Sequence, residues 1–254
     1  MLSGASDGFD PALHAELARL EAGNFWFRAR NRLIAWAVRR YFPEAKTLLE
    51  IGCGTGYVLS ALAVALPHAQ LSASEVHADA LPYAADRVPG AAFFQMDARA
   101  LPFESEFDVV GAFDVIEHID VDTEVLREMH RAAAPGGGVL ITVPQHPFLW
   151  SAFDVHSHHV RRYTAAELRD KVTAAGFDIV RMTSFVSLLL PLMLASRLIK
   201  RTSPENHDPL AELRVSGWRN AALEAVMAAE RGLIRLGASF PAGGSLLLVA
   251  RRGG

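Results

Sequence analysis

Three glycines and an acidic residue stand together near residue 50, in a pattern suited to holding a polar ligand. Residues 50–56 read EIGCGTG. Glycines let the backbone turn sharply and approach a ligand closely, and a loop that opens a helix presents N–H groups to polar atoms. The dinucleotide fingerprint requires a glycine at the sixth position counted from Gly52, where this chain has Tyr57. The spacing therefore speaks against a nicotinamide-dependent oxidoreductase, which we keep as an alternative.

Acidic residues also end the apolar runs that follow this loop. Glu75 lies about 20 residues beyond it, where an acid commonly holds ribose hydroxyls. Asp97 follows the next apolar run, and Asp114 follows the one after that. Each acid alone could be an ordinary surface residue. Because the acids follow successive strand-like runs, the series predicts one ligand site at the carboxyl edge of a sheet.

Two groups of histidines could take a proton from a reacting group. His118 follows Glu117 just beyond the fourth apolar run, and His156, His158 and His159 lie in a later loop. Histidine titrates near neutral pH and suits a general base. The structural alternatives are a hydrogen-bonded residue beside the ligand for His118 and loop anchors for the other three.

The later loop also carries Arg161, Arg162 and Tyr163. These side chains could orient an anionic acceptor. We favour His159 over His158 as a catalytic residue because His159 lies nearer to them in the chain. Solvated loop charges are the alternative interpretation of the two arginines.

The elements that would position these residues alternate between strands and helices. Strand-like runs cover 47–51, 71–76, 91–96, 107–113, 139–143, 177–183 and 245–250. Helix-like runs cover 11–20, 24–41, 57–66, 79–87, 123–134, 165–175 and 216–236. This alternation predicts a mostly parallel sheet covered by helices on both faces.

The ordered motifs resemble those of class I S-adenosylmethionine-dependent methyltransferases. The series is LLEIGCGTG, ASEVHADAL, FQMDARALPF, FDVVGAFDVIEHI and PGGGVLITVP, within residues 47–183. The resemblance implies an α/β fold, a three-layer α/β/α Rossmann-like architecture. Its seven-stranded sheet would be mostly parallel with an antiparallel last strand, and its cofactor would be S-adenosyl-L-methionine.

The resemblance also implies which residues contact the cofactor. They are Glu50, Gly52, Cys53, Gly54, Gly56, Glu75, Val76, Asp97, Ala98, Phe113, Asp114 and His118. The glycines would line the methionine part, and Glu75 would hold the ribose hydroxyls. Val76 would flank the adenine, and Asp97 would accept a hydrogen bond from its amino group. Phe113 and Asp114 would form the floor near the sulfonium.

The run FWFRARNRLI near the N-terminus is similar to a type-11/12-like subgroup of bacterial members that begins with paired aromatics and arginines. By that analogy Trp26, Phe27 and Arg30 would close over the cofactor. Docking of this helix on the sheet is the alternative.

The spacing Asp114-x-x-Glu117-His118 looks like the E-x-x-E-H of ubiquinone-pathway O-methyltransferases and small-RNA 2′-O-methyltransferases. Members of both groups use a divalent cation there. Aspartate in place of the first glutamate shortens the reach, and an E-H pair is also common in members without metal. We therefore expect no metal, which leaves His118 as a candidate base.

The composition suits one methyltransferase domain over residues 1–254, with a helical cap at 1–42 and a helical insertion at 185–244. Apolar residues make up 51 %, the net charge is −3, and Cys53 is the only cysteine. These values give no sign of nucleic-acid binding or of an internal disulfide. No basic region followed by an apolar run marks a secretory signal, so a cytoplasmic location is expected.

Residues 185–199 are strongly apolar but shorter than the ~20 residues that cross a bilayer, and Pro191 interrupts them. Arg197, Lys200 and Arg201 adjoin them, so residues 185–201 could contact a membrane surface. Intramolecular packing and a homodimer are the alternatives. We expect methyl transfer to an oxygen of a small acceptor, lipid-like or isoprenoid. A catalytically silent member that binds a partner is the alternative function.

Overall fold

The computed structural model describes residues 14–200, 215 and 217–253, and only the backbone of residues 197–200. The beginning of the first expected helix, at residues 11–13, lies outside the described residues. The side chains of Arg197, Lys200 and Arg201 lie outside them as well.

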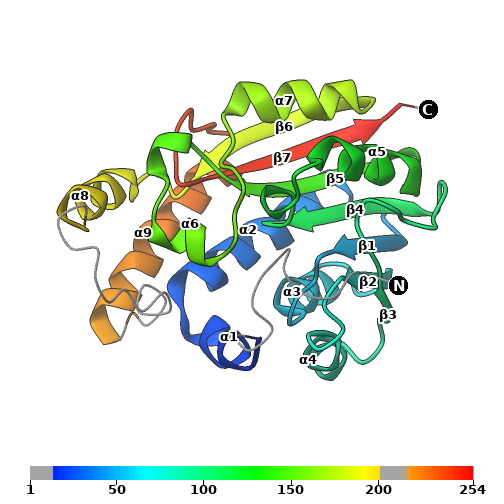
Figure 1. The fold of residues 1–254 in the computed structure, drawn as a ribbon, viewed down its shortest axis with the longest axis horizontal. Helices are drawn as coiled ribbons and strands as arrows, with labels where there is room; N and C mark the ends of the chain where they lie inside the picture. The colour runs from blue at the N-terminus through cyan, green and yellow to red at the C-terminus, as the bar shows by residue number, and fades with distance from the viewer. Residues whose placement is uncertain (1–13, 201–214, 216, 254) are drawn as a thin grey trace.

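A seven-stranded sheet forms the centre of the molecule, with strand order β3-β2-β1-β4-β5-β7-β6 (Figure 1). The strands are β1 Thr47–Ile51, β2 Gln70–Glu75, β3 Ala92–Gln95, β4 Phe107–Phe113, β5 Ala133–Pro144, β6 Phe177–Phe185 and β7 Ser245–Arg252. Strand β7 is antiparallel to both of its neighbours, and the other pairings are parallel. The predicted fold class is confirmed.

Helices cover both faces of this sheet. The α-helices are α1 His14–Leu20, α2 Phe25–Tyr41, α3 Tyr57–Ala65, α4 Leu81–Arg87, α5 Asp122–Ala132, α6 Ala152–His156, α7 Ala165–Ala174, α8 Leu190–Lys200 and α9 Gly217–Arg235. The described residues also form the 3₁₀ turns η2 Glu21–Gly23, η3 Ile116–His118 and η4 Pro147–Leu149.

An apolar core lies on each face of the sheet, between the strands and the helices that cover that face. Ile34 of α2, Leu62 of α3 and Met227 of α9 are buried on one face of the sheet. Leu126 of α5 and Leu168 of α7 are buried on the other. Removing this apolar surface from water is the main force that holds each layer to the sheet.

Two local expectations were wrong. Helix α5 ends at Ala132, and β5 begins at Ala133 rather than Val139, because Ala133 already pairs with Phe107 of β4. Pro135 has no N–H to continue a helix, so the chain turns to the sheet at once. Helix α6 was not expected at all. A capping box between Ser151 and Asp154 begins it inside the histidine-rich loop.

The stretch between the last two strands packs partly on the N-terminal helix. Phe185 is the last residue of β6, and α9 lies against α2 (Figure 1). The Asn220 side chain accepts a hydrogen bond from the Phe25 backbone at 2.8 Å. Among the described residues, no helix combines the length and apolar character that crossing a membrane requires.

Candidate functional site

A pocket of about 600 Å³ opens at the carboxyl ends of β1, β2 and β4. From β1 the sheet extends to one side through β2 and β3 and to the other side through β4 and β5. The pocket therefore lies at the topological switch point of the sheet. Ligands of open α/β sheets bind at such crevices. The glycine loop forms one wall, and the loop after β5 contributes Trp150, Val155 and His159 to the other.

The three glycines of the loop differ in how closely other residues approach them. All three have positive φ, of +64° at Gly52, +50° at Gly54 and +75° at Gly56. A Cβ at Gly52 would lie 2.6 Å from Val115, and one at Gly56 would lie 2.7 Å from Ala84. At Gly54 a Cβ would meet nothing within 4 Å. The pocket wall is therefore bare at Gly54, where a ligand can approach the backbone.

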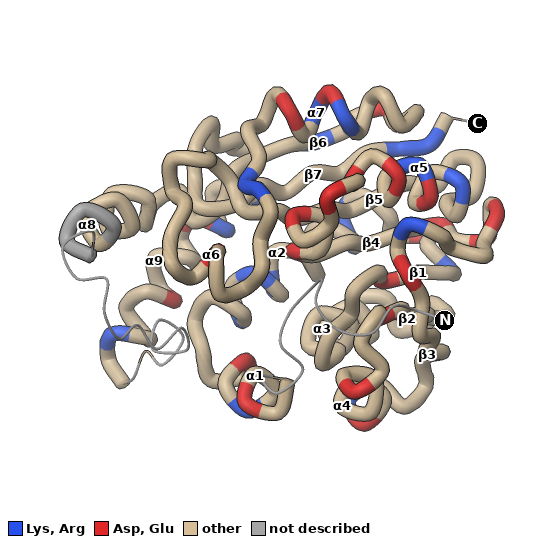
Figure 2. The backbone as a smooth tube through the Cα atoms, viewed as in Figure 1, with Lys and Arg blue, Asp and Glu red and all other residues tan. Residues whose placement is uncertain are grey.

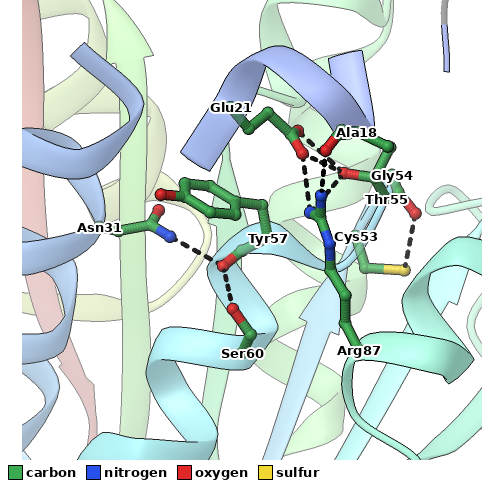
Figure 3. Close-up of polar contacts among 9 residues, drawn as sticks. All are labelled: Ala18, Glu21, Asn31, Cys53, Gly54, Thr55, Tyr57, Ser60 and Arg87. Carbon is green, nitrogen blue, oxygen red and sulfur yellow. Dashed lines mark hydrogen bonds and ion pairs between the residues drawn. The ribbon is translucent and has the colours of Figure 1, made fainter. Parts of the chain in front are cut away.

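The N-terminal segment is fastened to the glycine loop by polar contacts (Figure 3). The Thr55 hydroxyl donates to the buried Glu21 carboxylate at 2.8 Å, and Arg87 donates to the same carboxylate at 2.7 Å. Arg87 also donates to the carbonyl of Ala18 at 2.9 Å. The sequence reasoning missed Glu21, Thr55 and Arg87, because no motif connects residues so far apart in the chain.

Two carboxylates stand behind the glycine loop. Glu75 accepts from the backbone N–H groups of Gly54 at 2.9 Å, Val76 at 2.8 Å and His77 at 3.1 Å. Glu50 is buried, and its Oε2 has no hydrogen-bond partner among the described residues. Burial raises the pKa of Glu50 well above its ordinary value, against the pull of Arg30. A cationic ligand group beside Glu50 would satisfy this oxygen.

The adenine-side residues of the prediction also lie in the pocket. Val76, Asp97 and Ala98 line it, and so does the buried Cys53. Asp97 forms a hydrogen-bonded ion pair with Arg99, at 2.7 Å in its shortest contact, and these hydrogen bonds lower the pKa of Asp97. Burial raises the pKa of the Cys53 thiol, so it is poorly suited to act as a nucleophile.

The floor of the pocket contains a partly buried ion pair. Phe113, Asp114 and Arg30 line it, and Arg30 donates to Asp114. The guanidinium of Arg30 lies 4.6 Å from the ring centroid of Trp26. Trp26 and Phe27 are not among the described lining residues. Both rings lie beside the Arg30 guanidinium and contact each other edge to face, so in this structure Arg30 alone of the three reaches the pocket.

Three ligand-type side chains lie together at the opposite wall, where His118 and His159 line the pocket and the fully buried Glu117 is not among the described lining residues. One atom each from Glu117, His118 and His159 lie within 4.8 Å of one another, and the two imidazole centroids are 4.7 Å apart. Both Glu117 oxygens lack hydrogen-bond partners among the described residues, and burial raises the pKa of this carboxyl well above its ordinary value. Burial lowers the pKa of His118 to about 3, with a smaller contribution from His159. Asp114 is paired with Arg30 instead of joining this cluster.

A buried aspartate orients His159. Asp154 is fully buried, and its Oδ1 lies 2.8 Å from His159 Nδ1 and 2.7 Å from Arg162 Nε. Its Oδ2 accepts two hydrogen bonds from Ser151. Burial alone would raise the pKa of Asp154, but the contacts with His159, Arg162 and Ser151 hold it at about 2. Asp154 is thus ionised near neutral pH. The sequence reasoning missed it because its partners come together only in the folded loop.

Arg162 and Tyr163 lie behind the pocket wall, and neither is among its described lining residues. Arg162 donates to Asp154 and to the carbonyl of Gln145. Tyr163 is fully buried and donates to Asp122 at 2.6 Å. The expectation that these two side chains orient an acceptor therefore has no geometric support, because both are committed to holding the loop.

Comparisons with known proteins agree with this geometry. A family model described as "Methyltransferase domain" matches residues 19–182. A protein named "Probable S-adenosylmethionine-dependent methyltransferase" from Mycobacterium tuberculosis is 30 % identical over 168 residues, 64 % of this chain and 59 % of that protein. The "Ubiquinone biosynthesis O-methyltransferase" of Pseudomonas paraeruginosa is 27 % identical over 156 residues, 53 % of this chain and 65 % of that one. The chain thus covers less than two thirds of either relative's length.

A solved structure shows the same fold over the whole chain. The methyltransferase in complex with the Trm112 methyltransferase activator of Haloferax volcanii superposes with a TM-score of 0.66 at 19 % identity. The match covers 99 % of this chain and 100 % of that one. At this identity the likeness concerns the architecture alone.

Proposed function

This chain belongs to the class I S-adenosylmethionine-dependent methyltransferases, and from that premise we propose that it methylates an oxygen of a small, partly apolar acceptor with His159 as the base. Methyl transfer is a displacement at a sulfonium carbon, and S-adenosylmethionine supplies the activated methyl group when bound. The protein has to align the acceptor, exclude water and remove a proton from the acceptor oxygen.

The pocket fits the cofactor in shape and charge. The bare backbone at Gly54 would lie against the methionine part of the cofactor. The unpartnered oxygen of Glu50 would contact a positively charged group of the cofactor. Glu75 would hold the ribose hydroxyls, with Val76 and Asp97 beside the adenine. Asp114 would stand near the sulfonium, with its charge balanced by Arg30.

The contact between Asp154 and His159 is the observation that carries the assignment of the base. Asp154 engages Nδ1 of His159, which leaves Nε2 of a residue that lines the pocket free to accept a proton. A buried, ionised carboxylate fixes the imidazole tautomer and stabilises the imidazolium that forms. His118 suits the task less, because a pKa of about 3 makes it a weak base. We therefore give His118 the role of packing against His159 beside the cofactor.

The acceptor side of the pocket is apolar at its mouth. Trp150, Val155 and Val160 line it and remain partly exposed, and 62 % of the Val155 surface is accessible. An acceptor with a polar reacting oxygen and an apolar body would fit this wall. The relative named for ubiquinone biosynthesis supports, without establishing, an oxygen acceptor.

Helix α8 presents an apolar surface. Leu192 and Leu194 of α8 and the preceding Leu188 are exposed, whereas Leu189 is buried in the core. Contact of this apolar face with a membrane, or with a second copy, stays a proposal. If this apolar face contacts lipid, Leu192→Asp should reduce co-sedimentation of the protein with phospholipid vesicles. If the face contacts a second copy of the chain, Leu192→Ser should abolish the dimer at low protein concentration.

The test of the proposed function is transfer of a labelled methyl group. The protein is incubated with S-adenosyl[methyl-³H]methionine and three sets of probes: isoprenoid-substituted phenols, matched anilines and matched carboxylic acids. We expect label in the phenols, lost in His159→Ala. Label only in the anilines would overturn the oxygen assignment. Binding of cofactor with no transfer to any set would favour the catalytically silent alternative.

A divalent cation is the second candidate feature of this site. Glu117, His118 and His159 offer one carboxylate and two imidazoles, and the two carboxylate oxygens have no other partner among the described residues. We expect turnover to survive EDTA, with Glu117 protonated. Loss of turnover in EDTA, restored by Mg²⁺, would instead make these three residues ligands.

A further inference from the structure

A second cleft, of about 530 Å³, lies between α2, α3 and the end of α9. Figure 1 shows that α2 passes between α9 and α3. Figure 2 marks basic residues along α2. The cleft is lined by five arginines and by no acidic residue among those described: Arg28, Arg32, Arg39, Arg231 and Arg235. We call it the arginine cleft.

Only part of this positive charge is neutralised. Glu224 of α9 pairs with both Arg28 and Arg32. Arg39, Arg231 and Arg235 make no ion pair with any described residue. The arginine cleft therefore keeps a local positive excess in a chain whose net charge is −3.

Buried donors in the cleft also lack acceptors. Nη1 of Arg231 and Nε of Arg28 are inaccessible to solvent, and neither has a hydrogen-bond partner among the described residues. Leaving buried charged donors unsatisfied is destabilising. Burial, and then repulsion from Arg32 and Arg235, lowers the pKa of Arg231. An anion seated in the cleft would offset the repulsion among the guanidinium groups that line it.

The other residues that line the cleft narrow the choice of anion. They include the apolar side chains of Ala35, Trp36, Ala61 and Val64. Guanidinium groups are suited to phosphate oxygens because their N–H groups form paired, charge-assisted hydrogen bonds. Apolar side chains beside these arginines would contact the organic part of a phosphorylated ligand.

We propose that the arginine cleft binds the phosphate group of a phosphorylated ligand, either a free metabolite or a phospholipid headgroup. This site is separate from the methyl-transfer pocket, although Tyr57 contributes to the walls of both. Its occupation would hold α9 against α2 and so stabilise the helix that delivers Arg30 to the pocket.

The first experiment uses inorganic pyrophosphate as the probe, at constant ionic strength so that general screening does not change. Titration calorimetry on the full chain should show one binding site. Arg231→Gln and Arg39→Gln should each weaken binding about tenfold, the loss expected for one charge-assisted hydrogen bond. Arg127→Gln is the matched control, because Arg127 is exposed on α5, on the other face of the sheet.

Thermal unfolding distinguishes lost binding from lost folding. Without ligand, Arg231→Gln should unfold at the same temperature as the wild type or higher, because one of several like charges is gone. Pyrophosphate should raise the unfolding temperature of the wild type and of Arg127→Gln, and at the same concentration it should raise that of the two cleft variants less. Binding that is absent in the wild type, or equal in all variants, would overturn the proposal.

The source of the phosphate is decided with vesicles of phosphatidylcholine, with and without phosphatidic acid. Binding to the phosphatidic acid vesicles that pyrophosphate displaces and Arg231→Gln weakens would identify a headgroup site. Pyrophosphate binding with no vesicle binding would identify a free metabolite. Methyl transfer should continue in Arg39→Gln in either case, so failure of this proposal and failure of the proposed function can be told apart.

Discussion

The two walls of the methyl-transfer pocket are built in different ways. The wall at the glycine loop is mainly backbone, shaped by three residues with positive φ and supported by Glu75 through three N–H groups. The wall after β5 is mainly side chain, assembled around the buried Asp154. We infer that the first wall sets affinity for the cofactor and that the second sets turnover of the acceptor.

The largest expected effect is on the backbone wall. Gly54→Val should abolish S-adenosylmethionine binding in calorimetry, because its side chain would occupy the open space and its φ of +50° disfavours a β-branched residue. Gly90→Val is the control, since an added Cβ there also meets nothing within 4 Å and its φ is not positive. Full affinity in Gly54→Val would place the cofactor elsewhere.

The next effect separates the two walls. His159→Ala should lower turnover by about 10²–10⁴-fold, the usual contribution of a general base, and leave cofactor affinity unchanged. Asp154→Asn should lower turnover less and shift the pH dependence of turnover, because the imidazolium loses its stabilising charge. His156→Ala is the control, since His156 is exposed and outside the described lining residues. If His159→Ala and Asp154→Asn kept the turnover of the His156→Ala control, the second wall would have a structural role and no part in catalysis.

A smaller effect is expected at Glu75. Glu75→Ala should weaken cofactor binding by about 1–3 kcal/mol, because hydrogen-bonding groups of ligand and loop lose their acceptor. Turnover at saturating cofactor should change little if the walls divide their tasks as inferred. A large fall in turnover with unchanged affinity would contradict that division.

The smallest effect concerns the support behind the second wall. Burial would raise the pKa of Asp122, but Lys171, Tyr163 and Arg161 outweigh it and lower the pKa. A depressed folded-state pKa contributes stability above the unfolded-state value near 3.9, and this stability is lost as pH falls through the folded-state value. Asp122→Asn should therefore lower stability by about 1 kcal/mol near pH 7 and become indistinguishable from wild type in strong acid.

Urea unfolding at a series of pH values measures this difference. Asp120→Asn is the control, because Asp120 is exposed and only its backbone carbonyl accepts from Arg161. A difference between Asp122→Asn and wild type that persists unchanged down to the strongest acid in which the protein still folds would show that the contribution is not electrostatic.

Much of the backbone wall could be predicted from the sequence. Local patterns suffice there, because a glycine loop between a strand and a helix and an acid after the next strand each depend on neighbours in the chain. The placement of Gly54, Glu75, Val76 and Asp97 in the pocket agrees with the motif order.

The side-chain wall could be predicted only in outline. His159 is singled out for its proximity to Arg162 and Tyr163, yet both of these are buried and neither is among the described residues that line the pocket. The residue that orients His159 is Asp154, which the capping box of an unexpected helix brings into place. The missed link between Glu21, Thr55 and Arg87 is of the same kind.

The sequence by itself determined the family, the alternation of strands and helices, and the residues that follow each strand, because these features repeat over short distances along the chain. The tertiary structure alone decided which polar side chains meet. A histidine became a candidate base, and arginines on two distant helices became one cleft, through burial and long-range packing. Those interactions depend on how the whole chain packs around its sheet, so the spacing of residues along the chain cannot predict them.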